Sequence, residues 1–185
     1  AASLFKLNPK VDDLPEKYSL KYNGIRLMVM GRVKQGGTGC YCSENALLQT
    51  LISHLLLGRD EVVILDMEAG IEHMTRGTAE AVDAFIVVIE PGQRSLQTAR
   101  TVLEMASTLG VPKVFAVINK VRGSDDLDFI RSHIGSLKLI GSIGFHESVL
   151  DADIKGLSPY DSSTEAVDEV RDIKSAIEEE LEHGN

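Results

Sequence analysis

The chain has 185 residues, of which 43% are hydrophobic, and 19 basic against 28 acidic residues give it a formal net charge of -9. This length suffices for one domain with a substantial core, so we predict a single domain spanning residues 1–185. The acidic balance and the low aromatic content of 5% disfavour nucleic-acid partners, and no apolar run approaches the roughly 18 residues that cross a membrane.

The first 24 residues carry turn and breaker signals at Pro9, Pro15 and Asn23-Gly24, and we expect irregular structure there. After them, short apolar runs alternate with helical patterns. The expected strands are Ile25–Met30, Glu61–Asp66, Ala84–Ile89, Val111–Ile118 and Leu137–Ile143. The expected helices are Ser43–Leu57, Ser95–Leu109, Asp125–Ile134 and Thr164–Glu182. Because the strand runs are rich in Val and Ile without alternation, both faces should be covered, which predicts an α/β fold with a doubly wound, mainly parallel sheet.

A glycine-rich turn after the first expected strand holds both cysteines of the chain, Cys40 and Cys42. It is not a Walker A phosphate loop, because Gly39 is followed by Cys40-Tyr41 where Lys-Ser or Lys-Thr is needed. Thiolates suit zinc and nickel, and a two-fold dimer would bring four of them together. We therefore favour a metal site between two subunits, with a redox pair or two ordinary thiols as alternatives. Without a disulfide framework, a reducing cytoplasm is the expected compartment.

Chemistry in a parallel sheet gathers where the strands end. Four apolar residues before Asp66 form the pattern of a Walker B strand, whose carboxylate reaches Mg²⁺ through water. Gly70, four residues on, would turn a backbone N–H towards the terminal phosphate of a nucleotide. Asn119-Lys120 follows the fourth expected strand and resembles a corner that reads a nucleotide base through the side-chain amide. The alternative for Asp66 is an ordinary helix cap, but two such corners on neighbouring strands support each other.

Six short motifs together carry a family resemblance. They are Gly31-Arg32-Val33, Gly39-Cys40-Tyr41-Cys42, Asp66–His73, Arg76-Gly77-Thr78, Glu90-Pro91 and Asn119-Lys120-Val121. In this order and separation they resemble the CooC-type accessory ATPases of carbon monoxide dehydrogenase, which belong to the MinD/ParA-like P-loop NTPases. The resemblance runs from about Leu4 to Glu182. It implies a homodimeric, ATP-dependent factor that assists nickel insertion into the dehydrogenase, with the catalytic subunit of that enzyme as its partner.

The same resemblance implies roles for individual residues. Asp66 would be the catalytic Walker B carboxylate, with ATP or ADP and Mg²⁺ as cofactors, and Gly70 would lie in the switch that follows it. Asn119 would read adenine, with Lys120 beside it. The two cysteines would bind nickel or zinc between the subunits.

The chain departs from the family pattern in its phosphate loop. That loop lies on a strand before residue 1, with a Lys ahead of its glycines and Lys-Thr or Lys-Ser after them, and no segment here matches it. We therefore expect the chain as printed to lack the first strand of the sheet and not to hydrolyse ATP, although the intact protein would.

Two other functions remain open. A partitioning or positioning ATPase of the MinD/ParA type would share Asp66 and Asn119. It would need a basic DNA-facing patch or a membrane-binding helix, whereas the segment Asp168–Glu182 is acidic. A non-catalytic, metal-linked dimer scaffold would keep the cysteines and make no use of the nucleotide corners.

Overall fold

The structure, a computed structural model, describes residues 18–29, 62–67 and 82–182. These residues fall into two compact units, one containing 18–29 and 62–67 and the other containing 82–182. Each unit is described by itself. The predicted helix Ser43–Leu57 and the predicted site residues Cys40, Cys42 and Gly70 lie outside the described residues.

The first unit contains a short hairpin. Strand β1 (Leu20–Tyr22) pairs antiparallel with β2 (Ile25–Leu27), and both strands are exposed. Asn23 and Gly24 join them with φ angles of 46° and 83°, as a two-residue turn of type I′ requires. The prediction of a buried, parallel strand at Ile25–Met30 was therefore wrong, as was that of irregular structure at 20–22. The Asn-Gly turn folds the apolar run back on the segment before it.

The second expected strand, Glu61–Asp66, is not found. Residues 62–67 have no regular secondary structure, and Val62 and Ile64 are 84% and 86% exposed. A strand is stabilised by its ladder of hydrogen bonds and by packing on a face. No strand pairing is present for these residues within the described ranges, so the apolar pattern alone does not produce a strand here.

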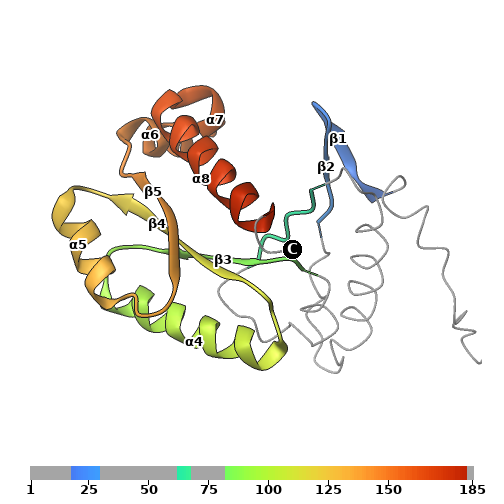
Figure 1. The fold of residues 1–185 in the computed structure, drawn as a ribbon. Coiled ribbons are helices and arrows are strands. Elements are labelled where there is room, and N and C mark those ends of the chain that lie inside the picture. The colour runs from blue at the N-terminus through green and yellow to red at the C-terminus, as the bar shows by residue number, and fades with distance from the viewer. Residues whose placement is uncertain (1–17, 30–61, 68–81, 183–185) are drawn as a thin grey trace, which may run out of the picture. The chain divides into compact units, whose positions relative to one another are not determined.

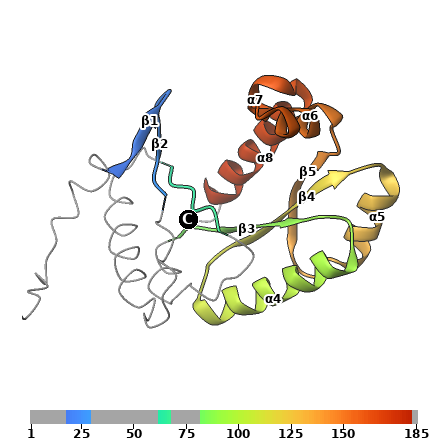
Figure 2. The same ribbon diagram turned by 180° about the vertical axis from the view of Figure 1, so that it is seen from behind.

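The second unit is a three-stranded parallel sheet with helices on both faces. Its strands are β3 (Phe85–Ile89), β4 (Val114–Val121) and β5 (Lys138–Gly144), in the spatial order β3-β4-β5. Helix α4 (Gln93–Leu109) connects β3 to β4, and α5 (Ser124–His133) connects β4 to β5. The two βαβ units confirm the predicted α/β class with its parallel sheet. Figure 1 and Figure 2 show α4 and α5 on the side of the sheet opposite α8.

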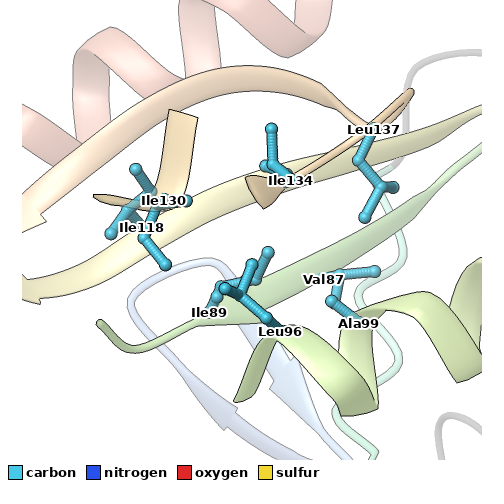
Figure 3. Close-up of a cluster of buried hydrophobic side chains, with 9 residues drawn as sticks. Val87, Ile89, Leu96, Ala99, Ile118, Ile130, Ile134 and Leu137 are labelled. Carbon is cyan, nitrogen blue, oxygen red and sulfur yellow. The ribbon is translucent and has the colours of Figure 1, made fainter. Parts of the chain in front are cut away.

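The main core lies between the sheet and the first two helices (Figure 3). Side chains from β3 and β4 meet side chains of α4 and α5 and of the segment that leads into β5. The buried members are Val87, Ile89, Leu96, Ala99, Ala116, Ile118, Ile130, Ile134 and Leu137. Burial of each large member contributes about 1.5–3 kcal/mol to stability. The central strand β4 is buried on both faces over Phe115–Ile118, so the core fixes where β4 ends.

Helix α8 (Thr164–Glu182) lies along β5 in the opposite direction, as three contacts show. Glu169 bonds Gly144 at the end of β5, and the side chain of Ile173 covers Gly141 in its middle. Glu180 forms an ion pair with Lys138 at its start, at 2.5 Å. The helix confirms the predicted bounds, and its position along the strand is set at three points.

Two short helices between β5 and α8 were not predicted. They are α6 (Glu147–Lys155), which ends at Gly156 in the left-handed conformation, and α7 (Pro159–Ser162). Within the ranges that the structure describes, no helix is long and apolar enough to cross a membrane.

Candidate functional site

The carboxyl ends of β3, β4 and β5 share one edge of the sheet, because the strands are parallel. Three polar segments follow or interrupt the strands there. Glu90 follows β3, Asn119 and Lys120 lie near the end of β4, and Phe145-His146 follows β5. The predicted ends of the first and third of these strands are confirmed. Strand β4 instead continues to Val121, three residues beyond its predicted end.

Asn119 and Lys120 form a bulge in β4. Ile118 lies opposite Ser142 and Val121 lies opposite Gly144, so two residues of β4 face one residue of β5. Lys120 adopts a φ of 58°, in the left-handed region that costs a non-glycine residue about 1–2 kcal/mol. Bulges turn side chains out of the regular ladder and are frequent next to binding sites. The strained backbone here directs both residues away from ordinary strand pairing.

The side chain of Asn119 is only partly used within the protein. Its Oδ1 accepts a hydrogen bond from the backbone N–H of Lys120, at 2.9 Å. An amide side chain has a second lone pair on the oxygen and two N–H donors. Among residues 18–29, 62–67 and 82–182, none bonds the Nδ2 of Asn119. The residue can therefore offer both a donor and an acceptor to the edge of a nucleotide base.

Lys120 pairs with the strand end next to it. Its Nζ lies 2.6 Å from Oε1 of Glu90, and the two side chains are 56% and 54% exposed. Exposed ion pairs of this kind contribute at most about 1 kcal/mol. The backbone N–H of Glu90 also donates to Oγ of Ser95 in the first turn of α4, at 3.0 Å. Sequence reasoning missed this pair, because the two residues are far apart in the chain and meet only at the sheet edge.

Arg122 and Asp126 fix the chain just after the bulge. Asp126 accepts bonds from Nε and Nη2 of Arg122 at 2.9 and 2.8 Å, and from its backbone N–H at 2.9 Å. These hydrogen bonds lower the pKa of Asp126 from 3.8 to about 2. The carboxylate sits in the first turn of α5, where the helix dipole favours negative charge. The turn from β4 into α5 is thus held firmly behind Asn119.

The rest of the predicted site is untested by this geometry. Asp66 is described, but it belongs to the first compact unit, so only the Asn119–Lys120 half of the nucleotide site is in view. The metal ligands Cys40 and Cys42 and the switch residue Gly70 lie outside the described residues. No group of three or more His, Cys, Asp or Glu side chains arranged to hold a metal is found within the described ranges.

Comparison with known proteins gives a consistent result at two levels. In sequence, the chain is 45% identical over 177 residues to the carbon monoxide dehydrogenase accessory protein CooC of Rhodospirillum rubrum, covering 96% of this chain and 67% of that protein. It is 42% identical over 178 residues to an uncharacterized ATP-binding protein of Methanocaldococcus jannaschii, covering 95% and 68%. No family model matches the chain.

In structure, the fold resembles that of a ParA family ATPase from Chlorobium tepidum TLS. The TM-score is 0.69, and the match covers 89% of this chain and 68% of the other at 17% sequence identity. An identity this low supports the fold alone, and it agrees with the α/β architecture described above. The identity of 45% over nearly the whole chain carries the relationship: the chain belongs to the family of the carbon monoxide dehydrogenase accessory protein CooC.

Proposed function

We propose that this chain is part of an accessory ATPase that assists nickel insertion during maturation of carbon monoxide dehydrogenase, acting as a homodimer in the cytoplasm. The observation that carries the proposal is the 45% identity to CooC over 96% of the chain. The relatives named as ATP-binding proteins and the ParA-like fold support a nucleotide as the cofactor. The catalytic subunit of the dehydrogenase is the partner in this proposal.

In the proposed nucleotide site, Asn119 reads adenine and Lys120 lies beside it. The described geometry fits a base, since the amide group of Asn119 keeps a donor and an acceptor for the base edge. Asp66 is the proposed Walker B carboxylate that orients Mg²⁺ through water, and Gly70 is the proposed backbone contact to the terminal phosphate. Bound Mg²⁺ would neutralise phosphate charge.

In the proposed metal site, Cys40 and Cys42 from two subunits provide four thiolates. Thiolates suit both zinc and nickel, and a tetrahedral set of four is the usual arrangement for zinc. Nickel would be the cargo of the protein in this proposal.

Asn119→Ala tests the nucleotide part. We expect the affinity for ADP with Mg²⁺ to fall about tenfold or more, since an amide pairing with a base edge discriminates by about 1–3 kcal/mol. Titration calorimetry with ADP and GDP measures the change. Ser132→Ala is the matched control, because its hydroxyl bonds only its own helix and the neighbouring His133. Equal ADP affinity in Asn119→Ala and the parent chain would remove Asn119 from the site.

The charge of α8 argues against the partitioning or positioning alternative. Arg171 and Lys174 are its only basic residues, and each pairs with an acidic residue of the same helix, Asp168 and Glu178 respectively. A helix with this balance repels anionic lipid and DNA.

A further inference from the structure

Glu169 of α8 bonds the end of β5 at two places. Its Oε2 accepts a hydrogen bond from the backbone N–H of Gly144 at 3.0 Å and lies 2.8 Å from Nε2 of His146. Since a carboxylate only accepts, Nε2 carries the proton in the second contact. The side chains of His146 and Glu169 are 20% and 34% exposed, so both bonds are partly shielded from water. Bonds to a charged, partly buried acceptor are stronger than neutral ones.

Gly144 makes this arrangement possible. A Cβ atom there would lie 3.1 Å from Nε2 of His146 and 3.4 Å from Oε1 of Glu169. The absence of a side chain lets the imidazole and the carboxylate close over the backbone. The carbonyl of His146 then accepts bonds from Val149 and Leu150 in the first turn of α6. The segment between β5 and α6 is therefore held from both sides.

The same segment is bonded to the bulge that presents Asn119. The backbone N–H of Phe145 donates to the carbonyl of Val121 at 2.8 Å, just where the bulge of β4 ends. Val121 is two residues after Asn119. A continuous path thus runs from Glu169 through Gly144 and Phe145 to the end of β4. The contacts of Ile173 and Glu180 further along α8 fix the helix on β5, so Glu169 cannot slide away from this point.

We propose that Glu169 is a positioning residue for the nucleotide base. It holds the Gly144–His146 segment against the bulge, so that this segment forms the wall of the base site next to the amide of Asn119. Phe145, whose side chain is 48% exposed, adds apolar surface at this edge. The inference rests on the proposed function, because it takes Asn119 as the base-reading residue, and it adds a residue of α8 that touches no nucleotide itself.

Three variants of α8 test the proposal, with calorimetric titration of ADP and GDP in the presence of Mg²⁺. In Glu169→Ala, the preference for ADP over GDP should fall about tenfold, because two hydrogen bonds that shape the base site are lost. Glu169→Gln should restore most of the preference, since its amide oxygen accepts both bonds. Glu178→Ala is the matched control, as Glu178 pairs only with Lys174 on the exposed side, and it should leave the preference unchanged. His146→Ala, which removes one of the two bonds, should give a smaller loss in the same direction.

Hydrogen exchange provides a readout that needs no ligand. In Glu169→Ala, the amides of Gly144 and Phe145 should exchange faster, while those of β3 keep the parent rate. If Glu169→Ala keeps both the ADP preference and the slow exchange, the inference is overturned and the proposed function stands. If exchange rises but the preference for ADP does not change, Glu169 is a structural residue and the inference is also overturned. If the parent chain binds no ADP, the proposed function fails and the inference with it.

Discussion

Asn119 and Lys120 occupy the one part of β4 that leaves regular pairing with β5 near the carboxyl edge. A side chain in a regular strand is committed to one face of the sheet, where it packs against a helix. The bulge frees these two residues from that constraint, and the ion pair between Lys120 and Glu90 and the bond between Lys120 and Asn119 offset part of the backbone strain. The residue that offers hydrogen bonds to a base is thus held by short, local contacts.

The pKa of Asp126 is a test of how firmly this corner is held. We expect a value of about 2, measured by NMR titration of the side-chain carboxyl carbon, because three hydrogen bonds from Arg122 stabilise the charged form. In Arg122→Ala, the pKa should return towards 3.8. A pKa of Asp126 that is ordinary in the parent chain would show that the contact is not maintained in solution.

The direction of the linked stability follows from the depressed pKa. The folded state holds the carboxylate in its charged form more strongly than the unfolded state does. The contribution of the Arg122–Asp126 contact is therefore fully present above pH 4 and is lost as the pH falls through about 2. Asp126→Asn should accordingly unfold at lower urea concentration than the parent chain at pH 7, and the difference between the two should shrink below pH 3.

At the level of elements, the most constrained contact is that of α8 with β5. A methyl group added at Gly141 would lie 2.5 Å from Cγ1 of Ile173, closer than two carbon atoms can approach. The reason for this closeness is a second irregularity: Ala116 lies opposite Leu139, and Val117 lies opposite Gly141, so Ile140 has no partner on β4. The extra residue turns Gly141 towards α8, while Leu139 packs on the core with α4 and α5.

Gly141→Ala should therefore lower the free energy of unfolding by about 1–3 kcal/mol, the usual cost of overpacking, as measured by urea denaturation. Ile173→Ala removes the colliding atom, so the double variant should be more stable than the sum of the two single effects predicts. Gly123→Ala is the control, because an added methyl group there meets nothing within 4 Å. Strict additivity of Gly141→Ala and Ile173→Ala would contradict the contact.

At the level of the whole molecule, the proposed metal site makes the sharpest statement. Native mass spectrometry of the chain purified without chelator, with and without added zinc or nickel, should show one metal ion per dimer. Changing both Cys40→Ser and Cys42→Ser should abolish metal binding and weaken the dimer while leaving the fold intact, since two thiolates per chain are the proposed ligands.

Circular dichroism of the same double variant checks that the fold is kept, and treatment of the parent chain with a chelator gives the matched metal-free state. An unchanged metal stoichiometry in the double variant would exclude a site between subunits made by these cysteines. A parent chain that is dimeric without metal would separate dimerisation from metal binding.

The sequence by itself determined the α/β class, the parallel strands at 84–89, 111–118 and 137–143 to within a few residues, and helix α8 at its observed bounds. It did so because the apolar periodicity of these segments is a local property. The six motifs likewise indicated the family that the 45% identity establishes. The same reasoning placed Asn119-Lys120 at the end of β4, where the structure has it, but left its role to be tested.

Only the tertiary structure decided which residues meet. The pairs Lys120–Glu90 and His146–Glu169 join residues from different elements, and no spacing in the chain indicates them. The bulges of β4 and β5 depend on how two strands pair, which the apolar pattern of each strand alone does not specify. The apolar runs at 25–30 and 62–66 show the converse. A run that reads as a buried strand became an exposed antiparallel hairpin in one case and an irregular segment in the other, because strands are made by partners as much as by their own residues.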